Sequence, residues 1–256
     1  MNKHAQSAPP ALRAGMALFQ DFDGSLVEIA SNPAAVFVPA GLRRTLQGVQ
    51  QFLRGAFAVV SGRRLAEIDA FFADCSFAGA GVHGAELRHA AQGVIENALE
   101  AQARDVVNVL RQHFADDPRI LVEDKKIAVA LHYRLAPERR DECEQLLRKI
   151  AQVEGLVVQP GKMVFEALPV GIDKGQAVHR LMAATPFLGR LPVYVGDDLT
   201  DEHGMAAVQL LGGFGIKVGP GPSLAQYRLP SVHAVHQWLA AAVPEMSPQA
   251  LAPQLE

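Results

Sequence analysis

The chain has 256 residues, of which 49% are hydrophobic and 20% charged, and its formal net charge is −3 at pH 7. This balance is typical of a globular protein and excludes both a disordered chain and a strongly basic nucleic-acid binder. The two cysteines are too few for a disulfide framework, and no apolar run approaches the roughly 20 residues that span a bilayer. We therefore expect a cytoplasmic protein of one large or two small domains that binds neither nucleic acid nor membranes.

The first part of the chain alternates between apolar runs and helical patterns. Strands are predicted at 16–19, 56–60 and 77–82, and helices at 42–53 and 64–72. Alternation of this kind indicates right-handed βαβ units and a parallel sheet.

The pattern changes after residue 84. Short apolar stretches with close connections predict a hairpin at 85–96 with Gln92-Gly93 at its turn, a helix at 97–115, strands at 120–122 and 127–133, a helix that opens at Pro137, and a second hairpin at 156–165. We interpret this strand-rich block as an α+β insertion.

The alternating pattern returns at Asp173. We expect a helix at 174–184, a strand at 193–195, a helix at 200–208, a strand at 215–218 and a last helix that includes Val232, Val235 and Leu239. Residues 1–84 and 172–256 are thus predicted to form one α/β core, which residues 85–171 interrupt.

Three carboxylates follow predicted core strands, namely Asp21, Asp23 and Asp197. They are expected to converge at the carboxyl edge of one parallel sheet, where ligands bind in open α/β folds. Mg²⁺ commonly sits on one or two carboxylates together with substrate phosphate and water. This pattern therefore indicates phosphoryl chemistry.

Four short motifs carry a resemblance to a known superfamily: DFDGS at 21–25, SGR at 61–63, DKG at 173–175 and GDDLTDE at 196–202. They resemble, in order and spacing, the motifs of the haloacid-dehalogenase superfamily. GVHGAE at 81–86, HYR at 132–134 and GKMVFE at 161–166 resemble the trehalose-6-phosphate phosphatase family within it. The resemblance runs from about Leu18 to Leu239, and it implies a Rossmann-like parallel-sheet core with a C2-type α+β cap.

The resemblance also implies a role for each motif residue. Asp21 would be the nucleophile that forms an aspartyl-phosphate, and Asp23 the general acid and base. Together with Asp197 they would bind Mg²⁺. Ser61 would donate a hydrogen bond to a phosphoryl oxygen, while Lys174 would neutralise charge. The remaining two carboxylates of the fourth motif would orient the ligands or pair with Lys174; they are Asp198 and Asp201.

Sugar contacts are assigned by the resemblance to Lys162 and Glu166 of the insertion and to Arg63, His83 and Gly84 of the core. Further candidates are Gly24, Lys125, His132 and Arg134. Two plainer interpretations stay open, because Lys125 beside Lys126 could be a solvated hairpin tip and His132 a core histidine.

The expected activity is Mg²⁺-dependent hydrolysis of trehalose 6-phosphate to trehalose and phosphate, with a possible functional link to a trehalose-6-phosphate synthase. Leu168 departs from the family, in which a basic residue usually stands two positions after the glutamate that matches Glu166. This departure leaves open another sugar phosphate, such as sucrose 6-phosphate, as the substrate. A non-catalytic sugar-phosphate sensor is the third hypothesis, which the complete set of motif residues disfavours.

Overall fold

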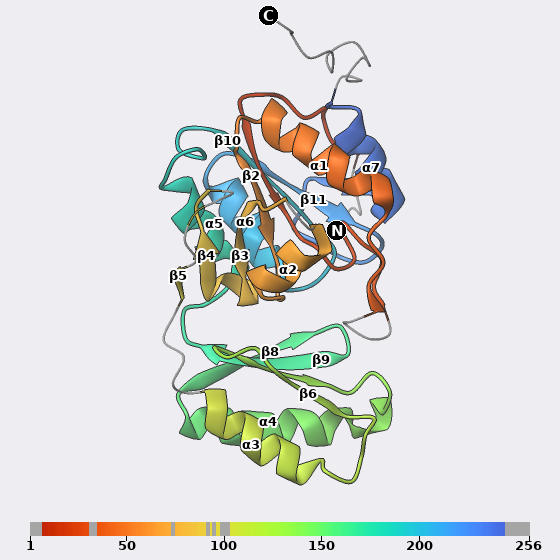
Figure 1. Ribbon diagram of the computed structural model, residues 1–256, viewed down its shortest axis with the longest axis vertical. Helices are drawn as coiled ribbons and strands as arrows, with labels where there is room; N and C mark the ends of the chain where they lie inside the picture. The colour runs from red at the N-terminus through yellow and green to blue at the C-terminus, as the bar shows by residue number, and fades with distance from the viewer. Residues whose placement is uncertain are drawn as a thin grey trace, which may run out of the picture.

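The computed structural model describes residues 7–30, 35–72, 75–90, 93, 96–97 and 103–243. Figure 1 shows a larger body above a smaller one, each built around its own sheet. The strands of the larger sheet lie in the order β12-β11-β10-β1-β2-β3-β4-β5. Their bounds are β1 Met16–Gln20, β2 Phe57–Val60, β3 Ala78–Gly81, β4 Glu86–Arg88, β5 Glu96–Asn97, β10 Leu191–Gly196, β11 Phe214–Val218 and β12 Tyr227–Leu229.

The neighbours from β12 to β3 all pair in parallel, and helices precede or follow these strands along the chain. These helices are α1 Ala40–Phe52, α2 Leu65–Phe72, α5 Lys174–Met182, α6 Asp201–Leu210 and α7 Val232–Ala240. The α1 helix packs beside α7, and α5 packs beside α6. The crossover from β1 to β2 contains α1, and the crossover from β10 to β11 contains α6. The two run in opposite directions along the sheet. Because both are expected to be right-handed, they place these two pairs of helices on opposite faces of the sheet. The predicted α/β fold is confirmed.

The central strand β1 is buried along its whole length, since helices cover both faces of the sheet. Its side chains join one apolar core with the aromatic rings of Phe57, Phe72, Phe187 and Tyr194. The apolar run before Asp21 is therefore the middle of the sheet, and it carries the carboxylate to the centre of the carboxyl edge.

The smaller sheet is antiparallel, with the order β6-β7-β9-β8. Its strands are β6 Leu121–Asp124, β7 Val129–His132, β8 Leu156–Gly161 and β9 Val164–Pro169, and its helices are α3 Ala103–His113 and α4 Arg140–Val153. Figure 1 shows both helices on the side away from the larger body, so the other face of the sheet points toward it. We call residues 103–169 the cap, and the larger body the core.

Some predicted boundaries differ from the structure. We expected the chain from residue 85 onward to belong to the insertion, but β4 and β5 extend the larger sheet, because β4 pairs antiparallel with β3. The hairpin itself is confirmed, although Gln92 of its predicted turn lies outside the described residues. Short 3₁₀ turns, η2 Val82–Gly84 and η3 Pro137–Arg139, precede β4 and α4. The short edge strand β12 was not predicted.

Among the described residues, no helix has both the length and the apolar character needed to cross a membrane.

Candidate active site

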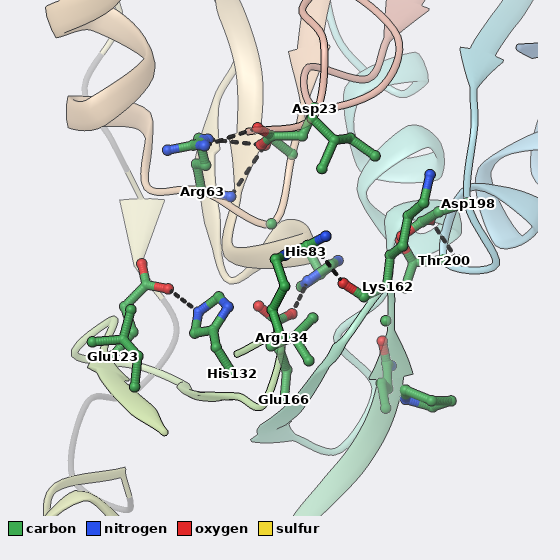
Figure 2. A pocket seen from close by; sticks show the side chains of 18 of the residues that line it. Asp23, Arg63, His83, Glu123, His132, Arg134, Lys162, Glu166, Asp198 and Thr200 are labelled. Carbon is green, nitrogen blue, oxygen red and sulfur yellow. Dashed lines mark hydrogen bonds and ion pairs between the residues drawn. The ribbon is translucent and has the colours of Figure 1, made fainter. Parts of the chain in front are cut away.

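A pocket of about 310 Å³ lies between the carboxyl edge of the core sheet and the open face of the cap sheet. Figure 2 shows side chains from both bodies facing each other across it. Most of the predicted site residues line it: Asp21, Asp23, Ser61, Arg63, His83, Lys174, Asp197 and Asp198 from the core, and Lys125, His132, Arg134, Lys162 and Glu166 from the cap. The structure therefore brings together residues that lie far apart in the sequence.

Asp21 follows β1 directly and is only 3% exposed. The Nζ atom of Lys174 lies 2.9 Å from its Oδ1 atom and 2.6 Å from Oδ1 of Asp201. Burial raises the pKa of Asp21 well above its ordinary value; the charge of Asp201 adds to this rise, and the Lys174 ammonium opposes it. Burial would lower the pKa of Lys174, but Asp201 and Asp21 raise it well above its ordinary value, so the ammonium stays charged.

Lys174 is the first residue of α5, and the residue before it explains how the helix begins there. The side chain of Asp173 accepts a hydrogen bond from the backbone N–H of Gln176, at 2.9 Å, and so caps the helix. The acidic residue at position 173 therefore has a local structural role beside Lys174.

Asp201 is fully buried and saturated with hydrogen bonds. Its Oδ1 atom accepts one hydrogen bond from Lys174 and another from the Tyr194 hydroxyl, whose oxygen lies 2.9 Å away. Its Oδ2 atom accepts from the backbone N–H groups of Asp197 and Asp198, at 2.9 and 3.0 Å. Asp201 thus holds both the lysine and the loop that carries Asp197.

Asp197 follows β10, and its carboxylate lies against Gly24. A Cβ atom at Gly24 would lie 2.3 Å from Oδ2 of Asp197, and the φ angle of Gly24 is +84°. Burial, with the charges of Asp201 and Asp198, raises the pKa of Asp197 to about 7. Gly24 is not among the residues that line the pocket, and it makes room for the Asp197 carboxylate.

The carboxylate oxygens of Asp21, Asp197 and Asp201 lie within 4.8 Å of one another, close enough to hold one metal ion. The predicted ligand set was Asp21, Asp23 and Asp197. The structure gathers the first and the last of these, but the carboxylate of Asp23 pairs instead with Arg63, at 2.7 and 2.8 Å. Figure 2 shows the Asp23 carboxylate pointing toward Arg63, and Asp23 does not belong to the cluster of Asp21, Asp197 and Asp201.

The segment after β2 forms one wall of the pocket. The buried Oγ atom of Ser61 accepts a hydrogen bond from the backbone N–H of Arg63 at 3.1 Å. The guanidinium of Arg63 lies 5.6 and 5.4 Å from the ring centroids of Phe22 and Phe71, which fix its position by cation–π contact.

Two glycines near His83 have spacing roles. A Cβ at Gly62 would lie 2.8 Å from Nε2 of His83, so the missing side chain makes room for the imidazole. Gly84 has a φ angle of +115°, and a Cβ there would lie 3.1 Å from the Cβ of Ala177 on α5. Gly84 is not among the residues that line the pocket, and it packs against α5.

Glu166, on β9 of the cap, pairs with two basic side chains. Its carboxylate forms hydrogen bonds with Nε2 of His83 and with Nζ of Lys125. Lys125 also donates to the carbonyl oxygen of Gly62 at 2.7 Å. Lys125 is only 5% exposed, so its interpretation as a solvated hairpin tip is wrong, and Lys126 is the exposed neighbour.

His132 is not a core histidine, because it faces the pocket and its Nε2 atom lies 2.7 Å from the carboxylate of Glu123 (Figure 2). Glu123 was missed by the sequence analysis, although it stands two residues before Lys125. Other unpredicted polar residues also line the pocket: Arg119, Gln159 and Thr200.

Lys162 lies at the turn between β8 and β9, and its Nζ atom is 3.7 Å from Oδ2 of Asp197. Arg134 donates to the backbone carbonyl of Lys162 at 2.8 Å and so braces this turn. Lys162 therefore extends from the cap toward the acidic cluster of the core.

Leu168 lies outside the pocket. It is fully buried in a small apolar cluster with Val82 and Ala85 of the core and with Ile127 and Ala128 of the cap. The position at which the chain departs from the family pattern thus lies in the seam between core and cap, and its side chain does not line the pocket.

The model of the trehalose-phosphatase family matches residues 19–232. The trehalose-6-phosphate phosphatase of Escherichia coli (strain K12) is 42% identical over 232 residues, which cover 90% of this chain and 87% of that protein. The C-terminal domain of C. albicans trehalose-6-phosphate phosphatase has a TM-score of 0.79 at 20% identity, covering 94% of this chain and 99% of that one. A haloacid dehalogenase-like hydrolase from B. subtilis shares the fold, with a TM-score of 0.59 at 14% identity and coverage of 88% and 98%. The chain therefore belongs to the trehalose-phosphatase family and is a phosphatase with the haloacid-dehalogenase fold.

Proposed function

We propose that this phosphatase hydrolyses trehalose 6-phosphate to trehalose and phosphate, with Mg²⁺, through an aspartyl-phosphate on Asp21. The observation that carries the proposal is the single pocket that joins Asp21, Lys174 and Asp197 to the polar face of the cap. A phosphate ester bound there would place its phosphoryl group at the core end and its sugar against the cap. The substrate would be supplied by a reaction that forms trehalose 6-phosphate, such as that of a synthase.

The residues present fit a divalent cation. The cluster offers only carboxylate oxygens, which Mg²⁺ prefers, and burial together with the charges of Asp201 and Asp198 raises the pKa of Asp197. Asp21 and Asp197 would hold the ion. The Asp201 carboxylate already accepts hydrogen bonds from Lys174, Tyr194 and the loop, so it would position these two residues and would not bind the ion itself. When bound, Mg²⁺ would neutralise charge on the phosphoryl oxygens.

In the first step, a carboxylate oxygen of Asp21 attacks phosphorus, and the bond from phosphorus to the sugar oxygen breaks. Asp23, in its protonated form, gives its proton to the departing sugar oxygen, so trehalose leaves as the neutral alcohol. Arg63 holds the ionised Asp23 carboxylate through the bidentate pair, and one Asp23 oxygen would leave that pair to carry the proton. Lys174 stays beside Asp21 and compensates the charge that develops on the phosphoryl oxygens.

In the second step, the Asp23 carboxylate takes a proton from a water molecule as the water oxygen attacks phosphorus. The bond between phosphorus and the Asp21 oxygen breaks, which releases phosphate and restores the Asp21 carboxylate. Asp23 regains its proton, so it is ready for the next cycle.

The cap would bind the sugar through its polar residues at the pocket. Glu166, Lys125 and Lys162 come from two hairpins of the cap sheet, and Glu123 and His132 form a further pair between β6 and β7. A disaccharide presents many hydroxyl groups, which suit charged donors and acceptors placed in this way. Because the cap would cover the phosphoryl end, it would also limit access of water to the acyl phosphate.

The test is phosphate release from trehalose 6-phosphate, glucose 6-phosphate and sucrose 6-phosphate, each with Mg²⁺ and with a chelator. We expect chelator-sensitive release with the highest kcat/KM on the trehalose ester. A higher kcat/KM on another ester would contradict the substrate assignment, and full activity in the chelator would contradict the metal. Tight binding of trehalose 6-phosphate without turnover would support the sensor hypothesis instead.

A further inference from the structure

Lys217 is a buried cation that the proposed mechanism does not use. It lies on β11 beside Gly196 of β10, and it is only 5% exposed. Its Nζ atom donates to the backbone carbonyl of Asp197 at 2.5 Å and to that of Val218 at 2.7 Å. Through the Asp197 carbonyl, the buried ammonium acts directly on the backbone of the loop that follows β10, while the Val218 carbonyl ends β11.

The peptide groups of Asp197 are held from two sides. The N–H of Asp197 donates to Oδ2 of Asp201 at 2.9 Å, while its carbonyl accepts from Lys217. The carboxylate of the same residue lies against Gly24, where no Cβ would fit. Asp201, Lys217 and Gly24 thus surround one residue, and Lys217 supplies the contact to its carbonyl.

We infer that Lys217 is a positioning residue that holds Asp197 in the orientation needed for Mg²⁺ binding. The inference rests on the proposed function, in which Asp197 is a metal ligand. Residues that orient the ligands of a metal influence affinity strongly, since their loss typically weakens metal binding about 10-fold to 100-fold.

The charge of Lys217 acts in the opposite direction from its hydrogen bonds. An ammonium close to the acidic cluster repels a cation, so removal of the charge alone would strengthen Mg²⁺ binding. Loss of the hydrogen bond to the Asp197 carbonyl would instead release the loop and weaken Mg²⁺ binding. The sign of the change in affinity therefore separates a positioning role from a purely electrostatic one.

The neighbouring strand offers a matched control. Arg228 on β12 lies opposite Lys217 in the sheet and also donates to backbone carbonyls, those of Gly219 and, at 2.7 Å, Gly221. These carbonyls do not belong to the metal loop. Arg228→Met removes a cation and its backbone hydrogen bonds in the same region without a contact to Asp197.

The experiment is a calorimetric Mg²⁺ titration of the full chain without substrate, for the wild type and for Lys217→Met, Lys217→Arg and Arg228→Met. We expect Lys217→Met to raise the Kd for Mg²⁺ about tenfold or more, and the other two variants to keep it within about threefold. In steady-state assays at subsaturating Mg²⁺, Lys217→Met should lower kcat and leave KM for the sugar phosphate nearly unchanged. Lys217→Gln, which keeps a shorter neutral donor, repeats the test should Lys217→Met not fold.

An unchanged or lower Kd in the folded Lys217→Met or Lys217→Gln variant would overturn the inference while leaving the proposed function intact. A wild-type chain that binds no Mg²⁺ would overturn the proposed metal site and this inference with it. A variant that only unfolds at a lower temperature, with wild-type Mg²⁺ affinity, would show a merely structural role and would also overturn the inference.

Discussion

The carboxylate of Glu166 on the cap forms a hydrogen bond with Nε2 of His83 on the core. The same carboxylate binds Lys125 of the cap, and the Lys125 ammonium also donates a hydrogen bond to the Gly62 carbonyl of the core. One cap carboxylate therefore joins the two bodies at the pocket, and its charge should influence how firmly they are held together.

Glu166→Gln should change how stability depends on pH. Burial alone would raise the pKa of Glu166, but the charges of His83 and Lys125 and their hydrogen bonds lower it well below its ordinary value. The ionised form thus stabilises the fold above the pKa of the unfolded chain, about 4.3, and this contribution is lost as pH falls further toward the lowered pKa. The difference in Tm between wild type and variant should be larger at pH 7 than at pH 4. Equal differences at both pH values would contradict this account.

Asp21→Asn should abolish turnover without preventing folding. Loss of the nucleophile is expected to lower kcat by more than about 10⁴-fold, because one member of a cooperating catalytic set accounts for most of its effect. The carboxamide keeps the size of the side chain and the acceptor for Lys174. Phosphate release measures kcat, and a Tm near that of the wild type is the control. Appreciable release by the variant would exclude Asp21 as the nucleophile.

Gly24→Ala should displace Asp197. The added Cβ would lie 2.3 Å from its carboxylate, which must move, so both Mg²⁺ affinity and kcat should fall about tenfold or more. Gly212→Ala is the matched control, because its φ of +83° imposes the same backbone strain with nothing within 4 Å. Both variants should lose about 1–2 kcal/mol of stability from the left-handed backbone. Equal Mg²⁺ affinity in the two would refute the close contact at Asp197.

Leu168→Ala should cost stability and leave substrate preference unchanged. Leu168 is fully buried in the seam between core and cap, so the cavity should cost about 2–5 kcal/mol in urea unfolding. The ratio of kcat/KM for trehalose 6-phosphate and sucrose 6-phosphate should stay as in the wild type. Leu147→Ala, in the cap's own core, controls for a general loss of stability. A changed ratio of kcat/KM in Leu168→Ala, but not in Leu147→Ala, would show that Leu168 contributes to the choice of substrate.

The core of the site was predictable from sequence because strand ends in a parallel sheet meet at one edge. The apolar runs before Asp21, Ser61 and Asp197 are the neighbouring strands β1, β2 and β10, so local patterns were enough to bring these residues together. The pattern also predicted the helix that begins at Lys174, whereas Lys174 itself was picked out by the resemblance of the DKG motif at 173–175.

The cap contacts were less predictable because they depend on register and on distant pairs. Glu166 and Lys125 are 41 positions apart and meet only because β9 pairs with β7, with Ala130 opposite Glu166. The pairing of Asp23 with Arg63 joins residues 40 positions apart, and no periodicity encodes it. For Glu123 the signal was its spacing of two from Lys125, because alternate residues of a strand share a face.

The order of strands has a consequence for synthesis of the chain. The central strand β1 pairs on one side with β2 but on the other with β10, from Met16 opposite Leu191 to Gln20 opposite Val195. At about 5–20 residues per second, a ribosome needs roughly 10–35 s to make the intervening segment. During this interval one edge of the fully buried strand β1 has no partner, while the cap, made of near neighbours in sequence, is completed before β10 is made. The nascent chain is therefore most open to misassociation at β1, and replacing an apolar β1 residue should lower the yield of folded protein more than an equal change in the cap.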